Sequence, residues 1–182
     1  MSALQIRSLL VLGGARSGKS RYAQSLAESS AVRPVLIATA QAHDAEMTAR
    51  IARHAAERAP NWMLVEEPLE LASALRREAG VDRIVVVDCA TLWLSNLLLQ
   101  EADLAKESEE LAHSVQSLAG PVIFVSNEVG SGIVPENALA RTFRDAQGRL
   151  NQALAKACDS VVLVTAGLAL QLKPAEEPKF RL

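Results

Sequence analysis

The residues from Gly13 to Ser20 match the pattern G-x-x-x-x-G-K-[ST] at every fixed position. Glycines let backbone N–H groups turn inward around phosphate oxygens, and a helix that begins near Lys19 adds the positive end of its dipole. In this motif the lysine reaches the β- and γ-phosphates and the final hydroxyl ligates Mg²⁺, so we assign these roles to Lys19 and Ser20. The predicted nucleotide-binding loop consists of Gly13, Gly14, Ala15, Arg16, Ser17, Gly18, Lys19 and Ser20.

A carboxylate at the end of a strongly apolar segment is the second group that could do chemistry. Four consecutive β-branched residues precede Asp88, which is typical of a strand buried on both faces of a parallel sheet. Ligands of open α/β sheets bind at the carboxyl ends of the strands. Alone, Asp88 could be a surface residue after a core strand. A phosphate loop needs an acidic metal partner, so we expect Asp88 and Ser20 to be the Mg²⁺ ligands.

A parallel sheet is needed to bring these groups to one edge. The phosphate motif has an apolar run before it and helical spacing after it, and the same alternation continues along the chain. We therefore predict an α/β, P-loop NTPase (RecA-like) three-layer sandwich with a mostly parallel central sheet. The expected strands are 9–12, 34–40, 62–67, 83–88, 121–126 and 160–165. We expect the strand 160–165 to be the last of the chain. The expected helices are 21–27, 45–58, 68–79, 91–100, 101–118 and 139–157. Residues 1–173 are expected to form one catalytic domain and 174–182 a polar tail.

Composition narrows the class of protein. The chain of 182 residues has 19 basic and 21 acidic side chains and a net charge of -2, which does not favour sequence-independent nucleic-acid binding. Cys89 and Cys158 are far apart in apolar stretches and fit buried free thiols better than a metal or redox pair. We find no signal peptide and no apolar run of the ~18 residues that a membrane span needs. These features predict a soluble protein of the reducing cytoplasm.

The helix expected over 91–100 is apolar almost all round, so it should be deeply buried or pack on another subunit. We expect Trp93 or its neighbours to lie at a contact between subunits of a homo-oligomer. The charged helix expected over 101–118 contains His113, which we interpret, like His43, as a surface residue.

The loop after the strand 121–126 carries two glycines, a proline and polar amides, which is typical of a functional loop. A switch GTPase would have N-K-x-D after such a strand, whereas this chain has Asn-Glu-Val-Gly at 127–130, so that class is disfavoured. The polar and cationic groups here could contact a substrate at the ligand edge; they are Asn127, Glu128, Asn137, Arg141 and Arg144.

Several segments together resemble the bifunctional adenosylcobinamide kinase / adenosylcobinamide-phosphate guanylyltransferase family of cobalamin biosynthesis (the CobU/CobP family). The V-P-E-N loop joined to the F-R-D-x-x-G-x-x-N-Q helix is the most specific of them. The matching segments run in order over nearly the whole chain and comprise 13–20, 38–40, 50–54, 88–98, 127–137 and 143–152.

The resemblance implies two reactions: phosphorylation of adenosylcobinamide by ATP or GTP, then transfer of GMP from GTP to adenosylcobinamide phosphate with release of pyrophosphate. It implies Mg²⁺ as cofactor and a homo-oligomer such as a trimer. We expect the corrinoid at the loop 127–137 and the Arg141/Arg144 face, because these lie at the ligand edge and offer polar and cationic groups. The resemblance also implies that GMP passes through a phosphoramidate on His54; by its spacing alone His54 is an exposed helix histidine. Position 53 is Arg, so the two adjacent histidines of some relatives are absent. The further residues implied near the nucleotide are Ala38, Thr39, Ala40, Ala55, Ala56, Glu57, Arg58 and Glu66.

Two other functions fit the phosphate loop. A nucleotide-binding ATPase or regulatory module would not need His54. A P-loop kinase without the guanylyl step would use ATP and form no covalent intermediate. A family member that has lost one of its activities is a further possibility, which the sequence leaves open.

Overall fold

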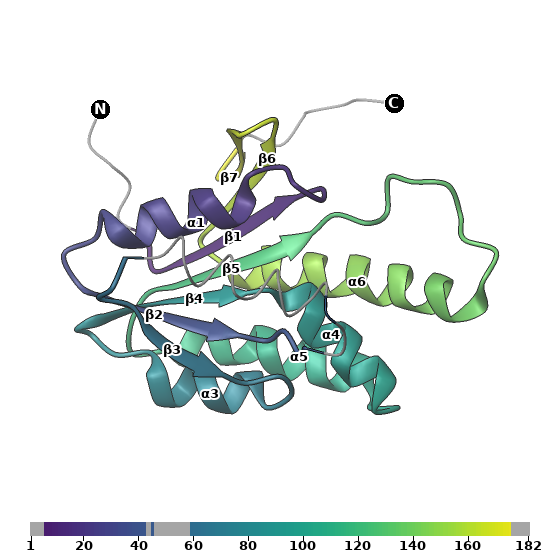
Figure 1. Cartoon of the computed structure of the whole chain (residues 1–182), viewed down its shortest axis with the longest axis horizontal. Helices are drawn as coiled ribbons and strands as arrows, with labels where there is room; N and C mark the ends of the chain where they lie inside the picture. The colour runs from purple at the N-terminus through teal and green to yellow at the C-terminus, as the bar shows by residue number, and fades with distance from the viewer. Residues whose placement is uncertain (1–5, 43–44, 46–58, 176–182) are drawn as a thin grey trace, which may run out of the picture.

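The computed structural model describes residues 6–42, 45 and 59–175 (Figure 1). A seven-stranded sheet of order β3-β2-β4-β5-β1-β6-β7 runs through the described part of the chain. All neighbouring strands pair in parallel except β6 and β7, which are antiparallel. The strands are β1 Ser8–Gly13, β2 Arg33–Ala38, β3 Met63–Glu66, β4 Arg83–Asp88, β5 Val122–Asn127, β6 Ser160–Thr165 and β7 Leu168–Lys173. The helices are α1 Lys19–Glu28, α3 Leu71–Glu78, α4 Ala90–Leu99, α5 Leu104–Ser114 and α6 Ala138–Ala157, with a 3₁₀ turn, η1, at Val115–Ser117.

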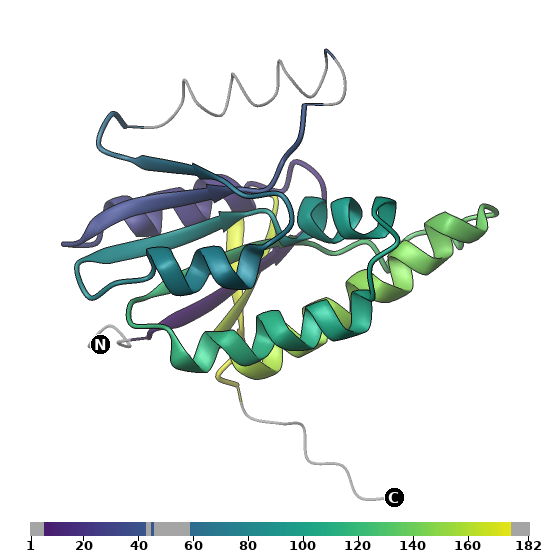
Figure 2. The same cartoon turned by 90° about the horizontal axis from the view of Figure 1, so that it is seen from below.

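Side chains alternate between the two faces of the central strands. In β4, Val85 and Val87 join the core that α3, α4, α5 and α6 cover, whereas Ile84 and Val86 join the core that α1 covers. Both faces of these strands are therefore buried, as their continuous apolar runs predicted. Figures 1 and 2 show α1 on one side of the sheet and the other helices on the opposite side, which gives the expected three layers.

The prediction of six strands with the last at 160–165 was wrong, because β7 follows β6 after a tight turn. Ala166 and Gly167 both have positive φ, 53° and 79°, which lets the chain reverse within two residues. Along β7 the residues are exposed or half-buried, so the strand adds little to the core.

Two helix boundaries also differ from the predictions. α3 begins at Leu71 and not at Pro68, because the Glu67 carboxylate accepts the N–H groups of Leu69 and Glu70 (3.2 and 2.9 Å) in a separate turn. The helix expected from residue 101 begins at Leu104. Glu101 adopts a left-handed conformation (φ 55°), and the Asp103 side chain caps the new helix.

We expected Trp93 or its neighbours to lie at a subunit contact. For Trp93 itself this was wrong, since the side chain is 1% exposed inside the chain's own core, whereas for its neighbours it stays a prediction. Its indole N–H donates to the Leu69 carbonyl oxygen at 2.7 Å, which satisfies the one polar atom of the ring. Among the described residues, no helix combines the length and apolar character needed to cross a membrane.

Candidate nucleotide-binding and transfer site

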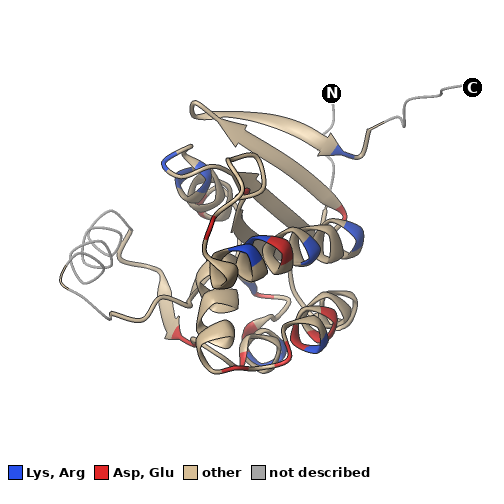
Figure 3. Ribbon diagram, turned by 90° about the vertical axis from the view of Figure 1, so that its right-hand side faces the viewer, with Lys and Arg blue, Asp and Glu red and all other residues tan. Residues whose placement is uncertain are grey.

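The carboxyl ends of the parallel strands bring the predicted groups to one edge of the sheet. Glu66 of β3 and Asp88 of β4 both pair with Ala38, the last residue of β2, so the three residues lie in one row. On the other side of β4, Gly13 at the end of β1 pairs with Asn127 at the end of β5. Figure 3 looks onto this edge, with α6 and its basic residues crossing it.

The phosphate loop is shaped by two glycines that have no room for a side chain. A Cβ on Gly13 would lie 2.6 Å from the Val164 carbonyl oxygen and would also collide with the Ser17 hydroxyl. Gly18 has φ 98° and precedes α1, and a Cβ there would lie 3.2 Å from the Cα of Gly167. The strand–glycine turn–helix context that the motif requires is therefore present.

The first turn of α1 presents its backbone N–H groups toward the loop. No side chain caps this helix and its first turn holds no acidic residue, so neither competes with a bound anion. Lys19 is 8% exposed, and its Nζ donates to the Gly14 carbonyl oxygen at 2.9 Å. The Lys19 ammonium group is thus held over the loop, where it could also contact the oxygens of a bound phosphate.

Neighbouring strands hold the phosphate loop from outside. The Gly167 N–H, in the turn between β6 and β7, donates to the Ser17 carbonyl oxygen at 2.9 Å. The Glu128 N–H, just after β5, donates to the Gly13 carbonyl oxygen at 3.1 Å. Backbone contacts therefore fix the loop on both sides before any ligand binds.

Asp88 and Lys19 both act electrostatically on Cys89. Burial raises the pKa of the Cys89 thiol to about 11, with a further rise from the Asp88 charge and an opposing effect of Lys19. The thiol is protonated at neutral pH and is a poor nucleophile. Burial likewise raises the pKa of Cys158 to about 12. Both cysteines are free and buried, as the sequence predicted.

The residues predicted to hold Mg²⁺ are a hydroxyl, Ser20, and a carboxylate, Asp88. Within the described ranges, no group of three or more His, Cys, Asp or Glu side chains is arranged to bind a metal ion. Mg²⁺ in phosphate-transfer sites is bound by one or two protein oxygens together with substrate phosphates and water, so this sparse oxygen set fits that ion.

A buried polar cluster joins β5 to α6, and sequence reasoning missed most of it. The Ser126 hydroxyl donates to the Asn151 side-chain oxygen (2.7 Å), and the Gln147 amide nitrogen donates to both Ser126 and Asn151 (3.0 and 2.9 Å). The Asn151 amide nitrogen donates to the Asn127 carbonyl oxygen at 3.0 Å. Amides at positions 147 and 151 lie one helical turn apart within the apolar stripe of α6, a signal that could have revealed the cluster.

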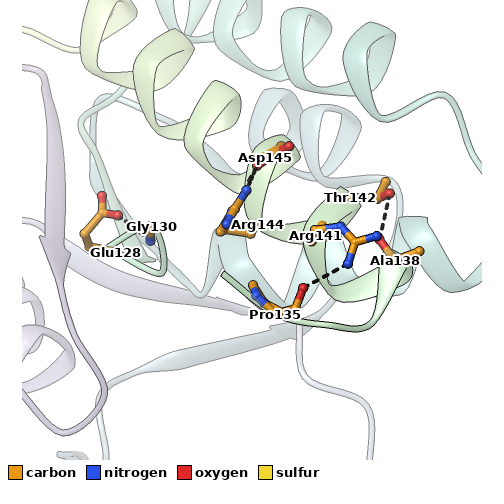
Figure 4. Close-up of polar contacts among 8 residues, drawn as sticks. All are labelled: Glu128, Gly130, Pro135, Ala138, Arg141, Thr142, Arg144 and Asp145. Atoms are coloured by element: carbon orange, nitrogen blue, oxygen red, sulfur yellow. Dashed lines mark hydrogen bonds and ion pairs between the residues drawn. The ribbon is translucent and has the colours of Figure 1, made fainter. Parts of the chain in front are cut away.

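The side chains predicted for the corrinoid lie at both ends of the loop 127–137, with Glu128 at its start and Arg141 and Arg144 on α6 after its end (Figure 4). Asn127 and Glu128 lie beside the phosphate loop, where the Glu128 carboxylate accepts the Gly130 N–H at 2.7 Å. Arg141 donates to the carbonyl oxygens of Pro135 and Glu136, at 2.9 and 2.6 Å.

The other two residues predicted for the corrinoid also have partners within α6. Asn137 accepts the Ala140 N–H and so caps the helix (3.0 Å), and Arg144 pairs with the Asp145 carboxylate (2.8 Å). Asn137 and Arg141 thus shape the loop itself, and Glu128 and Arg144 also have partners, the Gly130 N–H and the Asp145 carboxylate. The predicted residues His54, Ala55, Ala56, Glu57 and Arg58 lie outside the described residues.

Comparison with known proteins gives a consistent picture. A profile of the family described as cobinamide kinase / cobinamide phosphate guanyltransferase matches residues 9–172. The chain is 50% identical over 166 residues to the bifunctional adenosylcobalamin biosynthesis protein CobP of Pseudomonas aeruginosa, covering 90% of this chain and 96% of the relative. It is 39% identical over 181 residues to the protein of the same description, CobU, of Escherichia coli K12, covering 91% and 99%.

Solved structures resemble the fold at low sequence identity. A Pyrococcus horikoshii OT3 protein superposes with a TM-score of 0.54 at 11% identity, over 96% of this chain and 90% of its own. A prototypical ATPase of a bacterial type III secretion system superposes with a TM-score of 0.52 at 11% identity, over 91% and 56%. These likenesses confirm the predicted RecA-like α/β fold and carry no further meaning.

Proposed function

The chain belongs to the cobinamide kinase / cobinamide phosphate guanyltransferase family, and on this premise we propose that it catalyses both reactions. ATP or GTP phosphorylates adenosylcobinamide, and GMP from a second GTP is then joined to that phosphate, giving adenosylcobinamide-GDP and pyrophosphate. The observation that carries the proposal is the family match over residues 9–172, which includes both the phosphate loop and Asp88.

For the kinase reaction, the phosphate loop would hold the triphosphate through backbone N–H groups and the helix dipole. Lys19 lies over the loop and would neutralise charge on the β- and γ-phosphates as the terminal phosphoryl group moves to the substrate hydroxyl. Ser20 and Asp88 would hold Mg²⁺, which supplies charge neutralisation and orientation of the phosphates. Glu128 and Arg144 would contact the corrinoid beside this loop.

For the guanylyl reaction, we propose that an imidazole nitrogen of His54 attacks the α-phosphorus of GTP. The bond from the α-phosphorus to the bridging oxygen breaks, pyrophosphate leaves, and the ring loses its proton to solvent. A phosphate oxygen of the corrinoid substrate then attacks the same phosphorus, the P–N bond breaks, and the ring takes a proton back from solvent and leaves as neutral imidazole. An ordinary histidine pKa near 6.5 leaves most of the ring neutral and nucleophilic at pH 7.

The guanine base would lie near the end of β3. Glu66 is exposed there, in the row with Ala38 and Asp88, and its carboxylate could accept from guanine N1 and N2. An adenine base lacks this pair of donors, so Glu66 would favour GTP in this step. Such substrates, together with the two free thiols, fit a reducing cytoplasm.

We also propose that the protein assembles as a homo-oligomer, with the trimer of the resemblance as the expected form. With Trp93 inside the core, the exposed side of β7 is the better candidate for the contact. Leu168, Leu170 and Leu172 are 75%, 61% and 42% exposed and alternate along this edge strand, so they share one face.

The test is a two-stage product assay with purified protein, Mg²⁺ and adenosylcobinamide. Label from γ-labelled ATP should appear in the corrinoid, and label from α-labelled GTP should then appear in a second corrinoid product. Hydrolysis of ATP with no labelled corrinoid would contradict the proposal and indicate an ATPase. Phosphorylation without GMP transfer would reduce the protein to a kinase.

A further inference from the structure

One buried amide of α4 holds two separate chain segments at the carboxyl edge. The side-chain nitrogen of Asn96 donates to the Thr39 carbonyl oxygen at 2.8 Å and to the Pro68 carbonyl oxygen at 3.1 Å. Thr39 directly follows β2, and Pro68 lies two residues after β3. Asn96 is 6% exposed, so both N–H donors are used within the protein and few waters can replace them.

Further contacts make the same two segments part of one rigid unit. The Thr39 hydroxyl donates to the Cys89 carbonyl oxygen (2.7 Å) and accepts the Cys89 N–H (3.0 Å), which ties β2 to the residue after Asp88. The Trp93 indole, one turn before Asn96 on α4, donates to the Leu69 carbonyl oxygen.

The two residues that Asn96 holds, Thr39 and Pro68, lie close to the residues proposed to bind GTP. Ala38 lies immediately before Thr39, and Glu66 lies two residues before Pro68, so the anchored segments flank the residues proposed to meet guanine. The chain between the two anchors contains His54. Within the described residues, the side chains of Asn96 and Trp93 donate to Thr39, Pro68 and Leu69. The phosphate loop is held instead by the N–H groups of Gly167 and Glu128.

We infer that Asn96 is a positioning residue chiefly for guanylyl transfer, with a smaller effect on the kinase reaction through Thr39, which is hydrogen-bonded to Cys89 next to Asp88. Asn96 holds the segments that follow β2 and β3 and so sets where GTP lies for attack at its α-phosphorus.

Without the Asn96 amide, Ala38 still pairs with Glu66, and the Glu67 N–H still donates to the Ala38 carbonyl oxygen, so the strands themselves stay joined. Loss of the amide leaves the carbonyl groups of Thr39 and Pro68 without their donor and loosens the segments that follow the two strands. A misplacement of about 1 Å is enough to slow a transfer reaction about 100-fold. The inference rests on the proposed function.

The test compares Asn96→Ala with Asn151→Ala, a matched control. Asn151 is also 6% exposed and also donates to a backbone carbonyl oxygen at this edge, but it anchors β5 beside the phosphate loop. Initial rates of adenosylcobinamide phosphorylation and of GMP transfer to adenosylcobinamide phosphate are measured for each variant. Thermal melting reports on folding.

Asn96→Ala should lower the rate of GMP transfer by about 10- to 100-fold while phosphorylation stays within about threefold of the wild type. Asn151→Ala should lower both rates together, because both reactions use the phosphate loop. Equal losses in Asn96→Ala would overturn the inference, since a merely structural residue changes both activities alike. A wild-type enzyme without GMP transfer would instead overturn the proposed function, and the inference with it.

Trp93→Phe keeps the test decisive if Asn96→Ala does not fold. It removes the N–H donor to Leu69 while retaining most of the buried ring. The rate of GMP transfer should fall less than in Asn96→Ala, by about threefold to tenfold, and the rate of phosphorylation should be unchanged. An unchanged ratio of the two rates in this variant would contradict the inference.

Discussion

The phosphate loop and the ends of β2 and β3 lie at the same edge of the sheet, yet different groups hold them in place. Backbone N–H groups of Gly167 and Glu128 fix the phosphate loop, and Gly13 and Gly18 give it the space to turn. The ends of β2 and β3 pair through their backbones, and side chains of α4, chiefly Asn96, hold the segments that follow them. The residues that would bind phosphate belong to one local motif held by backbone contacts, whereas the segments on the guanine side are held in addition by a buried side chain of α4.

This difference predicts that damage to the phosphate loop stops both reactions. Lys19→Ala should lower phosphorylation and GMP transfer alike by about 10²- to 10³-fold, the usual effect of removing one group that stabilises developing charge. Lys106→Ala, on the exposed face of α5, is the control and should leave both rates unchanged. A Lys19→Ala variant that loses only one activity would break the picture of a shared phosphate site.

The stability of the loop should depend on which glycine is changed. Gly13→Ala should lower the free energy of unfolding by about 1–3 kcal/mol, because the added Cβ meets the Val164 carbonyl oxygen at 2.6 Å. Gly14→Ala is the matched control: no atom lies within 4 Å of its Cβ position, so a change below about 0.5 kcal/mol is expected. Urea unfolding measures both. Equal losses would show that backbone crowding does not shape the loop.

A change on the guanine side should affect GTP without affecting ATP. Glu66→Ala should lower the affinity for GTP in the transfer step by about 10- to 100-fold, since a hydrogen bond to a charged group contributes about 1.5–3 kcal/mol. Phosphorylation driven by ATP should stay the same. Glu70→Ala, another exposed carboxylate just before α3, serves as the control. Equal weakening of ATP and GTP would remove Glu66 from guanine recognition.

Substitutions at the two outer strands of the sheet, β3 and β7, test the proposed oligomer contact and should have the smallest effect on the catalytic rates. Leu170→Ser on β7 should shift the homo-oligomer toward smaller species by light scattering, while the catalytic rates change by no more than about twofold. Leu64→Ser on β3 is the matched change at the opposite edge, where the leucine is 52% exposed. Dissociation by Leu64→Ser alone would move the contact to β3.

Sequence reasoning succeeded where local pattern and burial coincide. The strands β1, β4 and β5 are buried on both faces, so their apolar runs are uninterrupted, and the phosphate motif falls between β1 and α1. β7 was missed because it is an exposed edge strand whose alternating leucines cover no core. The start of α3 was misplaced because the Glu67 carboxylate accepts the N–H groups of Leu69 and Glu70, a local contact that the spacing of apolar residues does not reveal.

The candidate site was only partly predictable for the same physical reason. Lys19, Ser20 and Asp88 belong to motifs whose chemistry can be read residue by residue. The contribution of Asn96 depends on which carbonyl groups approach it in three dimensions, and sequence spacing does not encode that. A lone amide in the run of leucines of α4 was the available signal, because a buried amide requires partners.

The central claim is that one phosphate site serves two reactions and that the second passes through His54. We would incubate the wild-type protein and the His54→Ala variant with Mg²⁺ and GTP labelled at the α-phosphate, denature them, and measure protein-bound label. The account predicts an acid-labile, base-stable label on the wild type and none on the variant, which should still phosphorylate adenosylcobinamide. Label that persists in His54→Ala would contradict the account by placing the nucleophile elsewhere, with His43 the next residue to test.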